Sequence, residues 1–345
     1  MNISGRMHLY RKIILAAVCF ATLLTACKKE EDTTKEYLTG TLSISMPGYL
    51  KPGDSKTFNV ADLAVLSRTD GGNVGYYVSY PGQKVNDTLW TESGKHIKDQ
   101  FVITAPDTLG YMSFTFCGFG DEDLYYSKSV SGNFTVVKAG VNGTSSMTGY
   151  AIDDKTPKFT DPRDGREYLA TDVNGTLWMR QNLCWEGAGK PYMDSPATSD
   201  VFGRYYTWEE ARTACPDGWR LPLESDWAKL CEAMGVSFTP KADIPGLAGK
   251  LMENISFNDT RMWEFNREVK VTNQSGLSAV PTGYALVDAD GYTFCDFYNY
   301  AAFWTGDEFD AGTALLRYMY YNSEIVFAGK ISKTDFATTV RCVKD

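Results

Sequence analysis

Hydrophobic and polar residues alternate in short runs through the first half of the chain. Leu42, Ile44 and Met46 alternate with polar residues, and Pro47-Gly48 ends that run. Further alternating runs follow, separated by turn residues: VGYYVSY (74–80), DQFVIT (99–104), YMSFTF (111–116) and NFTVV (133–137). Successive side chains of a strand point to opposite faces, so the pattern predicts about seven short strands with one buried face.

Short strands with turns between them are typical of an antiparallel β-sandwich. We expect one of the immunoglobulin-like type over residues 39–139, where such a domain most often acts as a spacer. Cys117 is the only cysteine in this stretch, so the inter-sheet disulfide of antibody domains cannot form. A stretch rich in Gly, Ser and Thr follows and predicts a linker over residues 140–152.

The second half, residues 153–345, has a different pattern, in which two helices stand among β-rich loops. Thr207 and Glu210 have the spacing of a capping box, which predicts a helix over residues 208–214. A second helix is predicted over residues 224–234, with Gly235 as its stop. Its apolar face comprises Trp227, Leu230, Cys231 and Met234. Leu223 cannot accept a capping hydrogen bond, so we expect this helix to begin weakly.

The N-terminus carries a basic segment, an apolar segment and a cysteine, in that order. The basic residues are Arg6, Arg11 and Lys12. The apolar run 13–24 is shorter than the roughly 20 residues of a bilayer span and suits the core of a signal peptide. LLTAC at 23–27 resembles a lipobox, so we expect residues 1–26 to be removed and Cys27 to be lipidated. The alternative is a secretory signal that carries this cysteine by chance.

Polar and charged residues follow the cysteine, and residues 27–38 are expected to form a lipidated tether. KKEED at 28–32 resembles the acidic tag with which Bacteroidetes direct lipoproteins to the cell surface. A charge run beside a lipid anchor can also be a solvated tether and nothing more. We expect an outer-membrane protein that is anchored by its lipid and exposed at the cell surface.

Charge and histidine content exclude several functions. The net charge of -9 argues against nucleic-acid binding, which needs a concentrated basic face. The chain has two histidines, His8 and His96, and the first lies in the segment expected to be removed. Ser-His-Asp hydrolysis, Cys-His catalysis and multi-histidine zinc sites therefore lack their residues.

The cysteines favour structural bridges. Of eight, Cys19 lies in the expected leader and Cys27 in the expected anchor. Six remain: Cys117, Cys184, Cys215, Cys231, Cys295 and Cys342. None has CxxC spacing, so neither a thioredoxin-type redox site nor a zinc ribbon is indicated, and an extracytoplasmic compartment permits disulfides.

The second half carries a series of motifs from a known family. They are TDPRDGREY (160–168), LWMRQNL (177–183), GRYYTWEEA (203–211), CPDGWRLPLESDW (215–227), SGLSAVPTGY (275–284), FWTGDE (303–308) and the C-terminal VRCVKD. This series resembles the Fibrobacter succinogenes major paralogous (FISUMP) domain, a module of Bacteroidetes and Fibrobacteres surface proteins. That domain is similar in turn to C-type-lectin-like domains and to formylglycine-generating enzymes. The resemblance implies a lectin-like α+β domain over residues 153–345.

The lectin-like resemblance implies one disulfide. In such folds a cysteine at the first helix bonds to one in the final strand, and Cys215 and Cys342 match these positions. The alternative is two buried free thiols. Cys184, Cys231 and Cys295 can form at most one more pair among themselves, and we expect Cys231 to stay unpaired.

Most of the functional residues of the related families are missing from this sequence. The calcium-binding triplets of sugar-binding C-type lectins are missing, and the acidic runs GDED (120–123) and DADG (288–291) are more typical of solvated turns than of calcium loops. The Arg-Gly-Gly-Ser stretch of formylglycine-generating enzymes is missing too, so an enzyme of that fold is a weaker alternative. We expect no catalysis, no cofactor and no metal.

We expect a lectin-like head that binds a glycan or a protein ligand. The competing hypothesis is a structural subunit or tip of a surface fibre or envelope complex. Sugar rings stack on exposed aromatic side chains, and the candidates in the second half are Trp185, Tyr192, Trp263, Tyr292, Tyr298 and Tyr300. For each of them a place in the core is the more typical role, and a ligand platform is the alternative.

Overall fold

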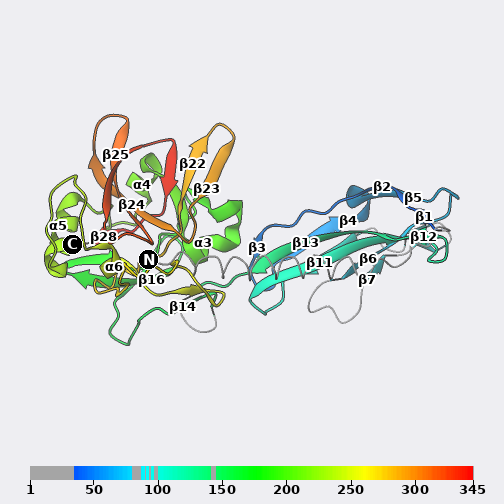
Figure 1. Ribbon diagram of the computed structural model, residues 1–345, viewed down its shortest axis with the longest axis horizontal. Helices are drawn as coiled ribbons and strands as arrows, with labels where there is room; N and C mark the ends of the chain where they lie inside the picture. Colours follow the sequence, from blue (N-terminus) through cyan, green and yellow to red (C-terminus); the bar gives the residue numbers. More distant parts are fainter. Residues whose placement is uncertain are drawn as a thin grey trace, which may run out of the picture.

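The computed structural model describes residues 35–79, 87–89, 91–92, 95–96, 100–140 and 145–344. The described chain is mainly β and forms an elongated arm, up to residue 140, and a globular head from residue 145 (Figure 1). The expected signal segment, Cys27 and most of the expected tether lie outside the described residues. None of the helices in the described ranges has the length and hydrophobicity of a membrane span.

Strands are the main elements of the arm. Its elements are β1 (Glu36–Tyr37), β2 (Thr39–Leu42), β3 (Tyr49–Leu50), β4 (Ser55–Asn59), α2 (Val60–Leu63), β5 (Ala64–Ser67), β6 (Gly75–Ser79), β7 (Asp87–Leu89), β8 (Thr91–Glu92), β9 (Lys95–His96), β10 (Gln100–Thr104), β11 (Gly110–Phe119), β12 (Tyr125–Tyr126) and β13 (Lys128–Val136). The largest sheet of the arm has the order β3-β13-β11-β6-β7, and β4 pairs with β10.

The arm core lies between the five-stranded sheet and the β4–β10 pair. Phe101 of β10 and Phe116 of β11 stack across it with ring centroids 5.3 Å apart, and both side chains are buried. We expected antiparallel pairing throughout the arm. Most pairs are antiparallel, but β3 runs parallel to β13 and β1 runs parallel to β12. Beyond β2 the alternation continues without a strand, with Ile44 and Met46 packed against the arm core.

The head combines short helices with several small sheets. Its elements are β14 (Met147–Thr148), β15 (Lys158–Thr160), β16 (Glu167–Val173), β17 (Thr176–Met179), β18 (Lys190–Pro191), η1 (Tyr192–Asp194), α3 (Pro196–Phe202), β19 (Arg204–Thr207), α4 (Trp208–Ala214), α5 (Glu224–Met234), α6 (Ala248–Leu251), β20 (Ser256–Phe257), β21 (Thr260–Arg261), β22 (Tyr284–Asp288), β23 (Gly291–Cys295), β24 (Tyr300–Glu308), β25 (Thr313–Tyr320), β26 (Phe327–Ser332), β27 (Phe336–Thr338) and β28 (Val343–Lys344). The sheets that matter below have the orders β18-β19-β27-β22-β23 and β24-β25-β26.

Both predicted helices are present with the predicted bounds. Thr207 and Glu210 form the capping box of α4, in which the Thr207 amide donates to the Glu210 carboxylate at 2.8 Å. Helix α5 ends at Gly235, whose φ of 66° lies in the left-handed region that glycine adopts without strain. The apolar face predicted for α5 is buried in the head core.

The start of α5 is stabilised by one carboxylate of the helix itself and by one from another element. The amide of Leu223 donates to the Asp226 carboxylate at 2.7 Å, and the amide of Glu224 donates to the Asp307 carboxylate at 2.7 Å. Asp307 belongs to β24 and therefore supplies from another element the acceptor that Leu223 lacks. The cap that the Leu223 side chain cannot provide is therefore replaced in part by tertiary structure, which local sequence could not show.

The expected linker is in part an element of the head. Met147 and Thr148 form β14, which pairs with β20, and Met147 is 2% exposed. The Ser145 hydroxyl is also bonded, donating to the Met147 carbonyl at 2.8 Å. Residues 145–148 are therefore packed and hydrogen-bonded, in contrast to the flexible spacer that their composition predicted.

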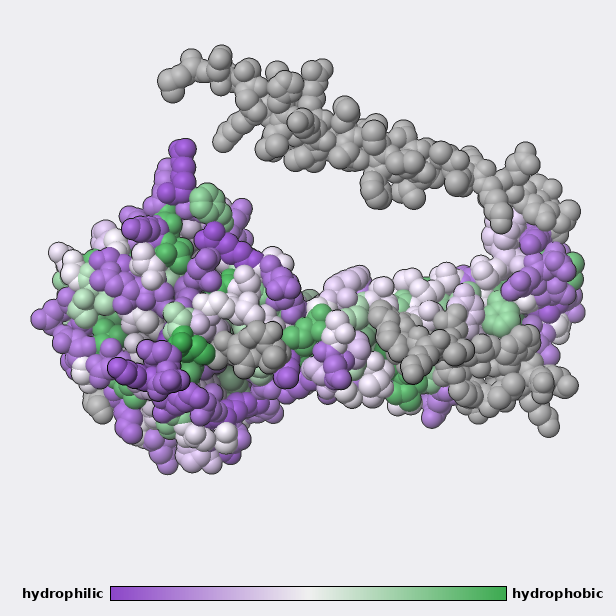
Figure 2. Space-filling model, turned by 90° about the horizontal axis from the view of Figure 1, so that it is seen from below, coloured by the Kyte–Doolittle hydropathy of each residue, from purple (hydrophilic) through white to green (hydrophobic). Residues whose placement is uncertain are grey.

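Arm and head also contact each other through β3 and α3. The Ser195 hydroxyl donates to the Tyr49 carbonyl at 2.9 Å, and the Tyr49 ring lies 6.1 Å from that of Tyr192. Lys51 and Asp200 form an ion pair of 2.6 Å across the junction. On the face shown in Figure 2, the head is mostly hydrophilic and a group of hydrophobic residues lies at the narrow junction.

Candidate functional site

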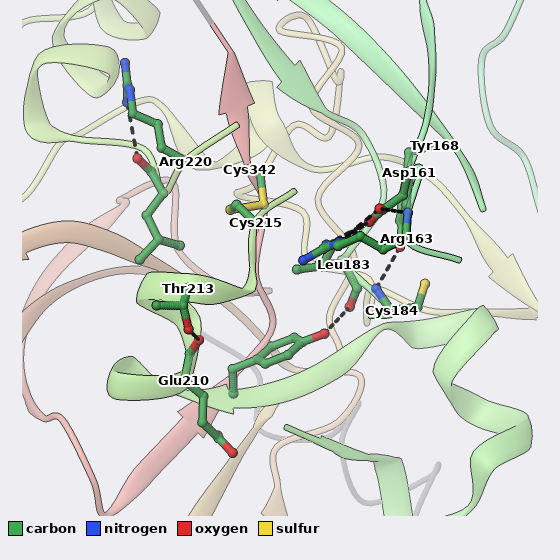
Figure 3. The surroundings of a disulfide bond; sticks show 12 residues. Asp161, Arg163, Tyr168, Leu183, Cys184, Glu210, Thr213, Cys215, Arg220 and Cys342 are labelled. Atoms are coloured by element: carbon green, nitrogen blue, oxygen red, sulfur yellow. Dashed lines mark hydrogen bonds and ion pairs between the residues drawn. A yellow bond between two sulfur atoms is a disulfide. The ribbon is translucent and has the colours of Figure 1, made fainter. Parts of the chain in front are cut away.

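One disulfide connects the C-terminal segment of the head to the end of helix α4. Cys215 caps the end of α4, and Cys342 immediately precedes β28 (Figure 3). The two sulfurs are bonded, with Cα atoms 5.9 Å apart and a sequence separation of 127 residues. The predicted Cys215–Cys342 bridge is therefore confirmed.

The remaining described cysteines are free thiols: Cys117, Cys184, Cys231 and Cys295. Cys231 is unpaired as predicted, and no second bridge forms among the described residues. Burial raises the pKa of both the Cys184 and the Cys231 thiol to about 11, so at neutral pH they stay protonated and unreactive. The Cys184 segment is held in place by its amide, which donates to the Tyr168 hydroxyl at 3.0 Å (Figure 3).

Two of the aromatic residues proposed as ligand platforms are core residues. Trp263 is 1% exposed and Tyr300 is 4% exposed, so both have the core placement that was the more typical expectation for these aromatics. The Trp263 indole donates to the Ala279 carbonyl at 2.9 Å inside the head core. The Tyr300 ring is enclosed by neighbouring rings from other strands.

The other four candidates are half-buried and already use much of their ring surface for packing. Tyr192 contacts Phe294 and Phe297 with ring centroids at 5.2 and 4.6 Å. Tyr298 packs against Phe297. The Tyr292 hydroxyl lies 3.4 Å from the Glu210 carboxylate, and burial together with that carboxylate raises the pKa of Tyr292 to about 12.

The last of these four, Trp185, is covered by a cation. The Arg163 guanidinium lies 4.3 Å from the centroid of the Trp185 ring. Arg163 is held there by Asp161, whose carboxylate accepts from the guanidinium at 2.7 Å. One face of the Trp185 ring is therefore occupied by the protein itself.

A larger aromatic surface lies elsewhere on the head, and of its rings only Tyr300 was singled out from the sequence. It combines six rings from five strands, which we call the tyrosine face: Tyr284, Tyr300, Tyr318, Tyr320, Phe327 and Phe336. The hairpins that carry β22 and β25 project from the same side of the head (Figure 1), and the Tyr284 and Tyr300 rings, 5.1 Å apart, join their sheets.

Strand register explains why these rings meet. In the β24-β25-β26 sheet, Tyr300 lies opposite Tyr320, and Tyr318 lies opposite Phe327. Tyr318 and Tyr320 are two residues apart on β25, so both point to the same face. The Tyr300, Tyr318 and Phe327 rings stack in series with centroids 5.4 and 5.2 Å apart.

The tyrosine face is accessible at its outer rings. Tyr320 is 36% exposed, and Leu286, which pairs with Phe336, extends the surface with 48% exposure. Tyr318, Tyr284 and Phe327 are half-buried. Within the described chain, the hydroxyl groups of Tyr318 and Tyr320 have no hydrogen-bonding partner, so each can still donate and accept.

The reverse side of the same sheet is fixed by a buried ion pair. Arg317 is fully buried and donates to both carboxylate oxygens of Glu224, at 2.9 and 2.6 Å. Its third contact is the Ala242 carbonyl at 2.6 Å. Since Glu224 opens α5, this pair locks the sheet that carries the tyrosine face to a helix of the head core.

No metal site is indicated by the described residues, which contain no group of three His, Cys, Asp or Glu side chains placed to hold an ion. In the two acidic runs, the Asp121 and Asp288 carboxylates accept backbone amides of their own turns at 3.0 and 2.9 Å. The carboxylates thus stabilise tight turns.

Comparison with known families assigns the head. The family model of the Fibrobacter succinogenes major domain matches residues 172–344. The chain belongs to this family. The match to the Fibrobacter succinogenes major domain covers α3 to α6, both cysteines of the disulfide and all six rings of the tyrosine face. No curated protein and no solved structure gives a significant match.

Proposed function

We propose that this chain is a lipid-anchored, non-catalytic binding protein of the bacterial cell envelope, whose head binds a glycan. Its anchor is Cys27, which follows a basic and apolar leader in the lipobox-like sequence LLTAC. The acidic tag at 28–32 resembles those of Bacteroidetes and favours the outer surface of the outer membrane. The arm, an immunoglobulin-like sandwich, acts as the spacer.

The tyrosine face is the observation that carries the binding function. Aromatic rings offer flat apolar surface to the C–H faces of sugars, and their free hydroxyl groups supply hydrogen bonds at the edge of that surface. An exposed aromatic surface on a monomeric domain is most often an interaction site. C-type-lectin-like folds also bind their ligands with loops on a disulfide-bonded scaffold. We propose this fold for the head.

Two features favour binding over catalysis. Cys342 and Cys215 are consumed in the bridge, so they cannot act as the reactive cysteine pair of a formylglycine-generating enzyme. The only histidine left after leader removal is His96, which belongs to the arm. Acid–base or nucleophilic catalysis of the common types would have to work without histidine.

A glycan array tests the proposal. The chain from Lys28 onward is compared with the Tyr318→Ala/Tyr320→Ala variant and with Tyr111→Ala, which removes a 68% exposed tyrosine of the arm. We expect the double variant to lose binding while the arm variant keeps it. Equal binding by all three would place the ligand elsewhere. A pull-down from envelope extract is run in parallel. If it captures an envelope protein and the array shows no bound glycan, the ligand of the head is a protein.

The alternative of a fibre or envelope subunit rests on two sheet edges. Strands β23 and β26 are terminal in their sheets among the described strands, and an edge strand can accept a strand from another chain. The edge of β26 is covered in part by the segment 242–244, so β23 is the more open of the two. Light scattering of the purified chain decides between the two. A monomer up to high concentration supports the binding function, and concentration-dependent filaments support the subunit.

A further inference from the structure

Two carboxylates border the tyrosine face. Asp243 lies at its β26 side, where its carboxylate accepts the amide of Ala328 at 2.9 Å. Ala328 directly follows Phe327, the outermost ring of the stacked series. Asp296 lies at the β24 side, where its carbonyl accepts the amide of Tyr300 at 3.1 Å. Burial together with the nearby Asp296 carboxylate raises the pKa of Tyr284 and Tyr320, and burial together with the Asp243 carboxylate is among the causes that raise the pKa of Tyr318. Each carboxylate therefore lies near one end of the rings.

The position of Asp243 is fixed by the buried ion pair behind the sheet. Arg317 donates to the carbonyl of Ala242, the residue before Asp243. On the other side Ile244 forms a two-way backbone bridge with Val326, at 2.8 and 3.0 Å. The short segment 242–244 is therefore held at both ends, so the Asp243 carboxylate is placed before a ligand arrives.

Neither carboxylate is neutralised. Within the described chain, Asp243 and Asp296 take part in no ion pair, and both are exposed. The second oxygen of Asp243 has no partner there either. The rim of the tyrosine face is consequently negative and offers solvent-exposed acceptor oxygens.

We propose that the tyrosine face selects sugars without acidic groups, because Asp243 and Asp296 accept hydrogen bonds from hydroxyl or ammonium groups of the glycan and repel its carboxylates and sulfates. This inference rests on the proposed glycan-binding function and adds the class of glycan. Amino sugars bind best, neutral sugars less tightly, and uronic or sulfated sugars least.

Three oligosaccharides of equal length test the order: chitosan hexamer, chitin hexamer and hexagalacturonate. Binding to the chain from Lys28 onward is measured by calorimetry at low and at physiological salt. We expect the chitosan hexamer to bind about 10-fold more tightly than hexagalacturonate, as two exposed charge pairs allow, and the gap to shrink with salt.

Variants locate the selectivity. Asp243→Asn/Asp296→Asn should bring the chitosan and galacturonate affinities to within about 3-fold, while binding of the neutral chitin hexamer persists. In Asp243→Asn the side-chain amide oxygen can still accept the Ala328 amide, so the fold is kept. Glu264→Gln/Glu268→Gln removes two exposed charges from another part of the head and is the matched control for net charge.

The outcomes separate this inference from the function on which it rests. If hexagalacturonate binds as tightly as chitosan, and the tyrosine variant abolishes both, the selectivity is refuted and the glycan site stands. A control variant that narrows the gap as much as Asp243→Asn/Asp296→Asn also refutes it, because overall charge then explains the preference. If no oligosaccharide binds, the glycan function itself fails.

Discussion

Removal of the Cys215–Cys342 bridge should strongly destabilise the head. The bridge closes a loop with a sequence separation of 127 residues, for which the chain-entropy model gives about 5 kcal/mol. Strain and residual structure in the unfolded chain reduce that value, so we expect the Cys215→Ala/Cys342→Ala variant to lose about 2–5 kcal/mol in its free energy of unfolding. This is a large part of the roughly 5–15 kcal/mol that stabilises a typical domain.

Guanidinium unfolding monitored by tryptophan fluorescence measures the effect. All tryptophans except Trp90 lie in the head, so the signal reports mainly on this part of the chain. Reductant should destabilise the wild-type protein to the level of the variant and leave the variant unchanged. Cys295→Ala, which removes a half-buried free thiol, is the control and should change little.

Two results would refute the reasoning. A loss below about 1 kcal/mol in the double variant would mean that the loop is already restricted in the unfolded chain. Alkylation of Cys215 or Cys342 in the unreduced, denatured protein would mean that the bond does not form at all.

Further substitutions test the anchor, the sheet and the thiols. Cys27→Ala should abolish lipid labelling and release the protein into the soluble fraction, and retention on membranes after detergent-free washing would refute the lipobox. Arg317→Met should lower the free energy of unfolding by about 3 kcal/mol, because Glu224 is left unpaired; if adding Glu224→Gln restores nothing, the ion pair is not the cause. Asp307→Ala should lower it by about 1 kcal/mol through the lost α5 cap, whereas an unchanged unfolding midpoint would exclude that role. Iodoacetamide at pH 8 should spare Cys231 in the native protein, because burial raises its pKa to about 11; fast modification, detected by mass spectrometry, would contradict that burial.

The elements with complete local signals could be predicted from the sequence. Helix α4 carries its own capping box, and α5 carries a one-sided apolar face and a terminal glycine, so both were located with correct bounds. The longer strands of the arm overlap the alternating runs, although the alternation at 44–46 forms no strand. In each case the residues that determine the element lie within it or within a few residues of its ends.

The elements that depend on distant partners could not be predicted in this way. Residues 145–148 have the composition of a linker, and only pairing with β20 turns them into a strand. Trp263 and Tyr300 resemble exposed aromatics until the strands that cover them are placed. The tyrosine face was missed because its rings come from five strands, and within it only Tyr318 and Tyr320 belong to the same strand.

The covalent loop also has a mechanical consequence. The expected anchor lies at the N-terminus, and the whole tyrosine face, residues 284–336, lies inside the loop that Cys215 and Cys342 close. When force acts between the two ends of the chain, the 127-residue segment cannot be drawn out, although unfolded it would extend by roughly 430 Å. Single-molecule stretching should show this length only after reduction. With the proposed anchor at Cys27, the bridge would therefore limit how far a bound ligand could move from the membrane while the segment behind Cys215 unfolds.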